Sequence, residues 1–271
     1  MKRKLLCLLG AILLWGSVRG QALYGTSGLL HLPTANMEKD KTFMFGGNYL
    51  DTHPLSTYFQ SKDVGYTLNY YLNMTFFPWL EIAYTCTLKH SDYGSSWPEK
   101  TWGKFSNQDR MFSIKLRLWK EGWWKEWTPQ VVLGSNDPGT HNSYGGGNIG
   151  LGNDSGSSNW FSRFYLVATK HFGSEGIGTL GVHVAYIIGN AQGIPHYKKL
   201  GAGVDFRLSL PADEIFMYKV LNGLSLMAEY DARTANIGAE YSFWKDYINV
   251  VVEFNRCRYF SGGLIFKVHL K

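Results

Sequence analysis

The sequence predicts an all-β fold: a single-domain, antiparallel up-and-down β-barrel of about 12 strands that spans a membrane. Three observations predict it: long segments in which every second residue is apolar, a leader that directs export, and no later apolar run long enough for a membrane helix. A period of two residues places apolar side chains on one face of a sheet and polar side chains on the other. A half-buried sheet of a soluble protein has the same period and is the alternative.

The clearest alternation lies between Val64 and Lys89. From Val64 to Phe76 every second residue is large and apolar, and the pattern resumes from Leu80 to Lys89 after a break at Pro78. Strands of globular proteins usually have about five or six residues, whereas tilted membrane-spanning strands need roughly 9–11. The length of these two segments therefore favours lipid on the apolar face and a polar lumen on the other.

Residues 1–20 have the layout of a secretory signal peptide. Basic residues at positions 2–4 precede an apolar core from Leu5 to Trp15, and cleavage is expected after Gly20. Four of the 27 basic residues lie in this leader, which leaves 23 against 21 acidic residues, so the charge balance gives nucleic-acid binding no support. Export together with alternating strands predicts the outer membrane of a Gram-negative-type bacterium as the location.

The rest of the chain divides into a segment outside the barrel wall and the barrel itself. Residues 21–41 contain glycines and Pro33 without a strand period, which indicates a periplasmic strap or a plug inside the lumen. Residues 42–271 form the expected barrel, with a short helix from Ala212. The expected strands are 42–50, 64–76, 80–89, 110–118, 130–135, 160–170, 179–188, 200–209, 224–231, 237–243, 248–255 and 262–270.

The connections between these strands support an outer-membrane barrel. With both chain ends periplasmic, the three longest connections (51–63, 91–109 and 136–159) all fall on the extracellular side, as is usual for such barrels. Four tryptophans between Trp119 and Trp127 favour an aromatic girdle at a membrane interface over an ordinary aromatic turn. We expect no disulfide between Cys86, in the middle of a strand, and Cys257, in a turn.

Charged residues recur on the polar faces of the expected strands and are the candidate lumen residues. They are Lys115, Arg117, Asp205, Arg207, Glu229, Asp231, Glu240, Glu253 and Lys267. They indicate either a charged lumen that holds or passes a hydrophilic chain, or an internal salt-bridge network that closes the barrel. Twelve strands lie between the filled eight-stranded and the open sixteen-stranded cases, and we favour a closed or plugged lumen. Trp97, Trp102 and Tyr144, in loops, are candidates for stacking on sugar rings.

Four segments in the same order carry a resemblance to a known family. They are Gly28–Met37, Asp109–Leu118 followed by Glu121-Gly122, Leu133–Thr140 with Phe161–Gly173, and Asn222–Asp231. Together they resemble the YjbH family of exopolysaccharide-associated outer-membrane proteins. The resemblance implies an outer-membrane barrel linked to the production or export of exopolysaccharide or capsule, and it supplies no catalytic residues.

The chain departs from that family in three respects. Members are often much longer, which puts in doubt any function that needs a second module. A glycine-rich insertion, Tyr144–Ser158, splits the third segment. Arg163 and Phe164 stand where a small residue and an acid are usual.

Two other functions are alternatives to this one. His141 and Ser143 have the His-x-Ser spacing of outer-membrane phospholipases, which are also twelve-stranded, but the adjacent glycines offer no rigid setting for an activated nucleophile. A passive porin is the other alternative. We expect no catalytic residue, cofactor or metal, and as partners outer-membrane lipid, polysaccharide and periplasmic export or assembly proteins, with no nucleic acid.

Overall fold

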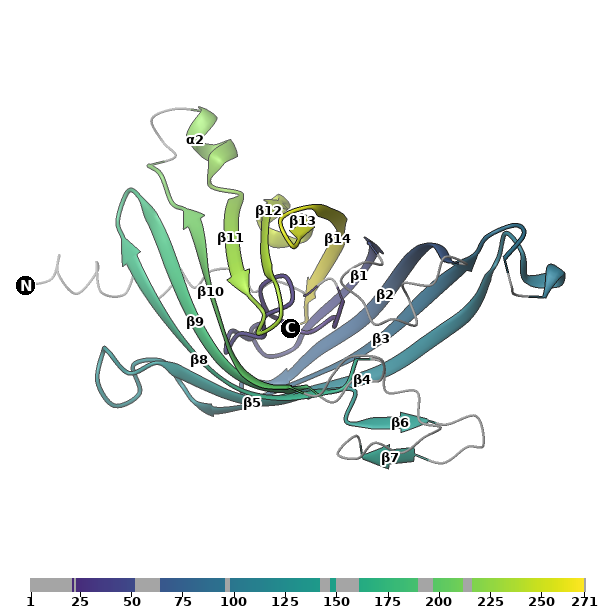
Figure 1. Cartoon of the computed structure of the whole chain (residues 1–271). Coiled ribbons are helices and arrows are strands. Elements are labelled where there is room, and N and C mark those ends of the chain that lie inside the picture. Colours follow the sequence, from purple (N-terminus) through teal and green to yellow (C-terminus); the bar gives the residue numbers. More distant parts are fainter. Residues whose placement is uncertain are drawn as a thin grey trace, which may run out of the picture.

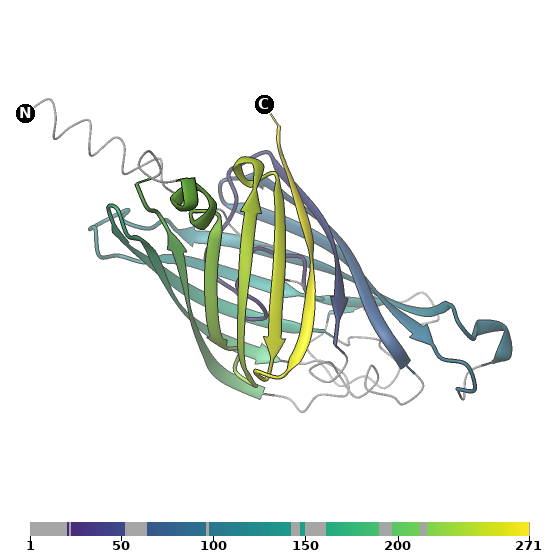
Figure 2. The ribbon, with the colours of Figure 1, turned by 90° about the horizontal axis from the view of Figure 1, so that it is seen from above.

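The protein is described by a computed structural model, which places residues 21, 23–51, 64–95, 98–141, 147–149, 161–189, 197–211 and 216–270. Twelve antiparallel strands close into one barrel in the order β1-β14-β13-β12-β11-β10-β9-β8-β5-β4-β3-β2 (Figures 1 and 2). The barrel is closed because β1 pairs with β14 on one side, from Thr42 opposite His269 to Tyr49 opposite Gly262, and with β2 on the other. The prediction of a twelve-stranded antiparallel barrel is therefore confirmed.

The strands of the barrel differ in length around the wall. They are β1 (Thr42–Leu50), β2 (Val64–Phe77), β3 (Leu80–Ser91), β4 (Phe105–Trp119), β5 (Gln130–Asn136), β8 (Arg163–Ser174), β9 (Gly178–Gly189), β10 (Tyr197–Leu208), β11 (Leu224–Tyr230), β12 (Ala235–Phe243), β13 (Ile248–Asn255) and β14 (Tyr259–His269). Outside the wall are a hairpin of β6 (Gly139–His141) and β7 (Gly147–Ile149), helix α2 (Phe216–Leu221), and two 3₁₀ turns at Glu99–Thr101 and Trp244–Asp246.

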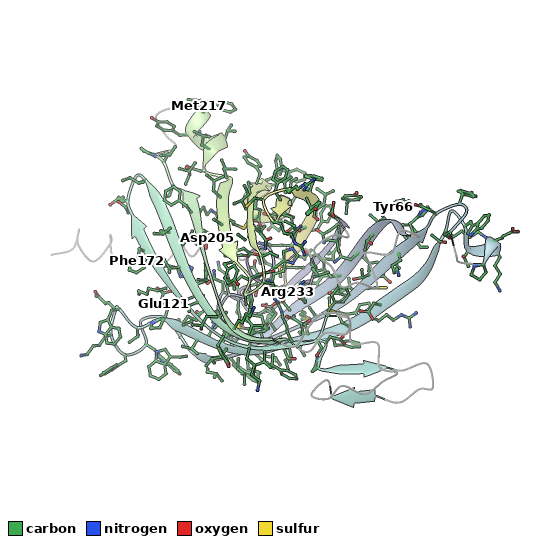
Figure 3. The ribbon with its side chains drawn as sticks, in the orientation of Figure 1. Tyr66, Glu121, Phe172, Asp205, Met217 and Arg233 are labelled. Carbon is green, nitrogen blue, oxygen red and sulfur yellow. The ribbon has the colours of Figure 1, made fainter. Side chains whose placement is uncertain are left out.

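Alternate residues of the wall face outward and inward, as the period of two predicts. On β2 the outward Tyr70, Leu72 and Phe76 are exposed, while Asn69 and Asn73 between them are buried in the interior. The outer face carries exposed leucine, phenylalanine, tyrosine and valine side chains all around the barrel (Figure 3). Such an apolar outer band around a polar interior is the arrangement of a barrel surrounded by lipid.

Several strand ends differ from the sequence prediction. The expected polar loop 91–109 is shorter, because β3 runs to Ser91 and β4 begins at Phe105, and the expected loop 136–159 contains β6 and β7. The sixth wall strand begins at Arg163, not at residue 160. Beyond the lipid band a strand is held by its ladder of backbone hydrogen bonds and needs no apolar face, so alternation does not mark its end there.

The periplasmic end, in the orientation assumed above, carries exposed aromatic side chains. Trp119, Trp123, Trp124 and Trp127, at the end of β4 and in the turn before β5, are all exposed, and so is Phe216 on α2. The role of the tryptophans as interface anchors stays a prediction. In the described part of the chain, no helix is both long enough and apolar enough to cross a bilayer. The proposed leader, residues 1–20, and Ala212 lie outside the described residues.

Candidate functional site in the barrel lumen

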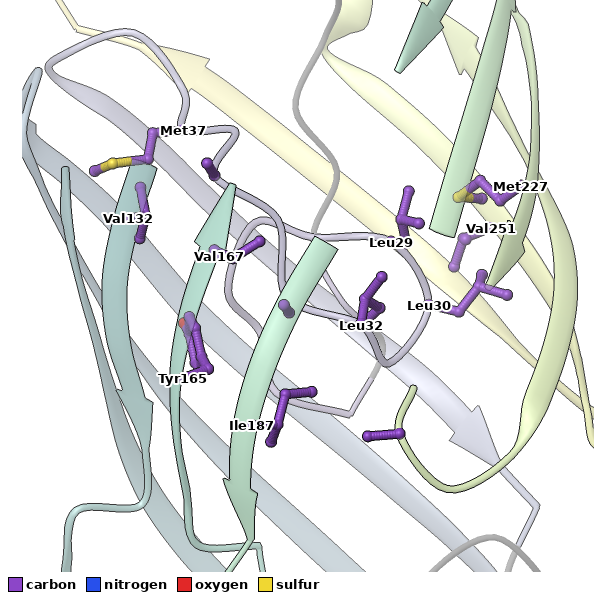
Figure 4. Close-up of a cluster of buried hydrophobic side chains, with 13 residues drawn as sticks. Leu29, Leu30, Leu32, Met37, Val132, Tyr165, Val167, Ile187, Met227 and Val251 are labelled. Atoms are coloured by element: carbon purple, nitrogen blue, oxygen red, sulfur yellow. The ribbon is translucent and has the colours of Figure 1, made fainter. Parts of the chain in front are cut away.

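The interior of the barrel holds the chain's own N-terminal segment. Residues 23–38, called the plug segment below, are almost all buried, and they precede β1 directly. Leu29, Leu30, Leu32 and Ala35 form one apolar cluster with inward-facing wall residues (Figure 4). The plug segment forms no strand, and Gly28 bridges Pro33 within it. Its backbone polar groups therefore need partners on the wall.

The wall of β10 and β12 has glycines where the leucines of the plug segment approach. A Cβ atom at Gly203 would lie 2.6 Å from Leu29 Cδ1, and one at Gly201 would lie 2.6 Å from Leu32 Cδ1. A Cβ atom at Gly238 would lie 2.7 Å from Leu30 Cδ2. Glycine within a strand often marks such a close approach. The shape of this wall is thus fitted to the three leucines.

The carboxylate of Glu229, on β11, binds the backbone of the plug segment. It accepts hydrogen bonds from three consecutive N–H groups, of Leu30 (3.0 Å), His31 (2.8 Å) and Leu32 (3.0 Å). Asn236 Nδ2 donates a further one at 2.9 Å. A carboxylate in a hollow made by successive N–H groups is a strong, charge-assisted arrangement. Glu229 therefore fixes the turn that carries the leucines.

On the opposite side of the lumen a pair of opposite charges binds the plug segment at Ser27. Glu81 Oε1 accepts hydrogen bonds from Ser27 N (2.7 Å) and Asn73 Nδ2 (2.8 Å), and its other oxygen accepts from the Ser27 hydroxyl. Lys115 Nζ donates to the carbonyl oxygens of Ser27 and Asn36, both at 2.7 Å, and lies 3.9 Å from Glu81. Neither charged side chain is exposed, so each depends on these partners.

Arg163, on β8, holds the start of the described chain. Its Nη1 donates to the carbonyl of His31 at 2.7 Å, its Nη2 to Gln21 Oε1 at 3.2 Å, and its Nε to Asn136 Oδ1 at 2.6 Å. The guanidinium also lies 3.6 Å from the centre of the Tyr24 ring, a cation–π contact. Arg163, which departs from the family pattern, thus binds the N-terminal segment through two hydrogen bonds and a cation–π contact.

A hydroxyl, an imidazole and a carboxylate line up on β8, β9 and β10. Thr169 Oγ1 accepts a hydrogen bond from Ala35 N at 2.9 Å and lies 2.9 Å from His183 Nδ1, and His183 Nε2 lies 2.7 Å from Asp205 Oδ1. The order resembles the relay that activates a nucleophile. Here the hydroxyl is covered by the backbone of the plug segment, so the geometry serves to position Ala35.

Two further ionic contacts hold the turn at His31 and the end of the plug segment. His31 Nε2 lies 3.3 Å from Glu253 Oε1. Burial alone would lower the pKa of His31, but Glu253, Glu229 and Asp231 together raise it to about 9. Lys267 Nζ lies 2.8 Å from Glu38 Oε1 and 3.0 Å from Asp246 Oδ1, so it joins the plug segment to the turn before β13.

Most of the charged residues predicted for the lumen lie in the interior. Lys115, Asp205, Glu229, Glu240, Glu253 and Lys267 are buried, and Arg117 and Arg207 are half-buried. Lys115 lies 3.9 Å from Glu81 of the wall and also binds the plug segment, and Glu229 binds the backbone of the plug segment. Asp231 was wrongly assigned to a strand: it lies in the turn after β11, where Oδ1 accepts from Arg233 N and Thr234 N.

The loop candidates are only partly described. Trp102 is half-buried and makes an edge-to-face contact with Tyr93, with ring centres 6.5 Å apart. Trp97, Tyr144 and Ser143 lie outside the described residues, and His141 ends β6. Cys86 and Cys257 are not joined in a disulfide. Among the described side chains, no three histidine, cysteine or acidic groups are placed to hold a metal ion.

Sequence reasoning did not single out several residues of the site. They are Glu81, His31, Thr169 and His183. The alternation around Pro78 places Glu81 on the polar face, so that residue carried a usable signal. Arg163 was noted only as a departure from the family pattern, and Thr169 carried no signal, because apolar side chains occur on both faces of β8.

The fold and the filled lumen define a class, that of membrane-spanning β-barrels with an internal plug. Residues 20–271 match the family described as "Exopolysaccharide biosynthesis protein YbjH", YjbH, so the chain belongs to this family and the resemblance inferred from the sequence is confirmed. A curated relative, "Uncharacterized lipoprotein YjbH" of Escherichia coli (strain K12), is 31% identical over 170 residues. That match covers 62% of this chain and 19% of the relative, so the chain spans about a fifth of the relative's length. Among solved structures, "KdgM porin" matches with a TM-score of 0.44 and 10% identity, over 85% of this chain and 99% of that one.

Proposed function

We propose that this chain is an outer-membrane barrel, closed by its own plug segment, that assists the production or export of exopolysaccharide or capsule without catalysing a reaction. Membership of an exopolysaccharide-associated family supports the link to the glycan. The observation that carries the proposal is that charged groups of the wall, Glu229, Glu81 and Lys115, bind the plug segment instead of facing an open channel.

In this proposal the plug segment and a glycan compete for the same lumen. The wall groups that now bind backbone N–H and carbonyl groups of residues 27–36 are the groups that hydrogen-bond the hydroxyls of a sugar chain. Displacement of the plug segment therefore both opens a path and frees donors and acceptors along it. In this proposal a periplasmic export or assembly protein that binds the barrel triggers this displacement.

The location follows from the same features. Cleavage after Gly20 would free the N-terminal segment to enter the lumen, and the apolar outer band suits the outer membrane. The test of location is fractionation of cells that express the chain. Recovery with outer-membrane markers, and an N-terminus at residue 21, are the expected results.

The test of function is deletion of the gene and measurement of surface polysaccharide and lipid composition. We expect less surface polysaccharide with unchanged lipid, and restoration by the wild-type gene. Unchanged polysaccharide in a strain that normally makes it would contradict the proposal.

The two alternatives predict other results. Stable conductance of the purified wild-type barrel in planar bilayers would indicate a passive porin. Lipid hydrolysis by the wild type that is lost on Ser143→Ala would indicate a hydrolase. We expect neither, since the lumen is filled and the family resemblance supplies no nucleophile.

A further inference from the structure

A groove of about 410 Å³ lies on the outer face of the barrel, over β9, β10, β11 and β12. Three exposed alanines line it: Ala202, Ala228 and Ala235. Outward positions elsewhere carry large side chains, such as Leu72, Phe112, Leu133, Leu166 and Leu264. The groove exists because these neighbouring strands present methyl groups at positions where many other outward positions carry larger apolar side chains.

The sides of the groove are apolar and belong to residues that the wall holds in register. Val204 pairs with Ala228, and Ala228 pairs with Ile237 across the next ladder. Val184 completes the opposite side. The side chains of Val204, Ile237 and Val184 are each more than 40% exposed, so no other described part of the chain covers them. The volume falls within the roughly 300–1,000 Å³ typical of ligand pockets.

One end of the groove is closed by a turn that carries positive charge. Cys257, between β13 and β14, lines the groove, and its Sγ donates to Ala235 O at 3.7 Å. Arg256 and Arg258 flank Cys257 and are both exposed. The N–H of Arg256 donates to Asn236 Oδ1 at 3.0 Å, which fixes the turn against β12. An apolar groove thus ends at two arginines.

The arginines lie at the end of the barrel opposite α2. In Figure 3, Arg233 in the neighbouring turn and Met217 on α2 mark the two ends. In the proposed outer-membrane orientation, the arginines therefore meet the headgroups of the outer leaflet. That leaflet is built from phosphorylated glycolipids with several acyl chains. An arginine guanidinium binds phosphate through paired hydrogen bonds, which fits such a headgroup.

We propose that this groove binds one acyl chain of a phosphorylated glycolipid of the outer leaflet, with the lipid phosphate at Arg256 and Arg258. The inference rests on the proposed outer-membrane orientation. It concerns the outer face of the barrel, and none of its residues belongs to the plug segment. Bound lipid would fill the space that the alanines leave in the apolar band.

The test is binding of a hexa-acylated, bis-phosphorylated glycolipid (lipid A) to the purified full chain in detergent, measured by native mass spectrometry. Ala228→Trp fills the groove, and Arg256→Gln/Arg258→Gln removes the phosphate site. We expect each variant to bind about tenfold more weakly than wild type. Leu133→Trp, on the outer face of β5, and Lys100→Gln/Lys104→Gln, in another turn at the same end, are matched controls that should bind as wild type does.

Further measurements test whether the phosphate is needed for binding and whether another lipid or a second copy of the chain occupies the groove. Dephosphorylated glycolipid should bind wild type as weakly as bis-phosphorylated glycolipid binds the arginine variant. The proposal would be overturned if phosphatidylglycerol bound the wild type as tightly as lipid A does. It would also be overturned if neither Ala228→Trp nor Arg256→Gln/Arg258→Gln weakened lipid A binding. A wild-type dimer that Ala228→Trp converts to a monomer would overturn it as well, because the groove would then be an interface between two copies. If Ala228→Trp does not fold, judged by heat-modifiable migration, Ala202→Leu replaces it. Because the assay does not measure polysaccharide, its failure is distinct from failure of the proposed function.

Discussion

The two sides of the lumen hold the plug segment by different means. On β3 and β4, Glu81 and Lys115 bind Ser27 with charges of opposite sign. On β10 to β12, the single carboxylate Glu229 binds three N–H groups, and wall glycines receive the leucines. The first side depends on polar groups that water can also satisfy. The second depends on the fit of apolar shapes as well, which water cannot replace.

This difference implies that the two sides respond to different changes. Loss of a polar contact on the first side is only partly offset when water enters the lumen, whereas release on the second side also exposes three leucines. We therefore expect the side of β10 to β12 to dominate retention of the plug segment. The following changes test that expectation, in order of decreasing effect.

Glu229→Ala should release the plug segment most strongly. Three buried N–H groups lose their acceptor at about 1–3 kcal/mol each, and Asn236 loses its partner. The measurements are protease cleavage within residues 23–38 and conductance in planar bilayers, and both should rise. Glu175→Ala, an exposed acid in the turn between β8 and β9, is the control. A barrel that stays closed after Glu229→Ala would show that the carboxylate does not retain the plug segment.

Lys115→Met or Glu81→Gln alone should weaken the other side, with a cost of about 3–5 kcal/mol for breaking a buried charge pair. The double variant should recover part of this loss, because no unpaired charge is then left buried. Thermal unfolding of all four forms in one detergent gives the coupling energy. Additive losses would mean that the two side chains act independently on Ser27. If these variants increased cleavage of the plug segment or conductance more than Glu229→Ala does, the side of β3 and β4 would contribute more to retention than the side of β10 to β12.

Gly203→Val should displace Leu29 and Leu32 from their places on β10. Overpacking of this kind costs about 1–3 kcal/mol. Gly47→Val is the matched control, since a Cβ atom there meets only Asn69 O at 3.6 Å. Cleavage of the plug segment should increase for the first variant and stay at the wild-type level for the second. Equal behaviour of the two would argue against a fitted wall.

Alkaline pH should loosen the turn around His31 by a smaller amount. The pKa of His31 is raised from 6.5 to about 9 in the folded protein, so its contribution is fully present below about pH 6.5 and is lost as the pH rises through about 9. Protease cleavage measured from pH 6 to 10 should therefore increase toward the upper end. His31→Gln should remove this step. A wild-type profile that matches that of His31→Gln would exclude the histidine as its source.

The wall of the barrel was predictable from sequence because lipid outside and water inside impose strict alternation. The strand Ile248–Asn255 coincides with its predicted bounds. The facing of β8 was not predictable, because Tyr165 and Val167 point inward into the apolar cluster with the plug segment, so that apolar side chains lie on both faces of the strand. A filled lumen thus obscures the pattern that identifies a barrel.

The sequence predicted which residues of the site face the interior, but not what they bind. Alternation placed Lys115 and Glu229 in the interior, but nothing local to either residue names its partner. Glu229 binds residues nearly 200 positions earlier in the chain, and those residues have no period that shows what they pack against. The position of residues 21–41 is decided by such distant contacts. A single sequence therefore left the strap and the plug as equal alternatives.

The pairing of β1 with β14 has a consequence for the stability of the closed ring. Only residues 39–41 separate the plug segment from β1, so the contents of the lumen are tied to one strand of the seam that closes the wall. A force that pulls on the plug segment is therefore transmitted to the ladder of backbone hydrogen bonds between β1 and β14. Removal of the plug segment thus loads the place where the first and last strands of the wall meet.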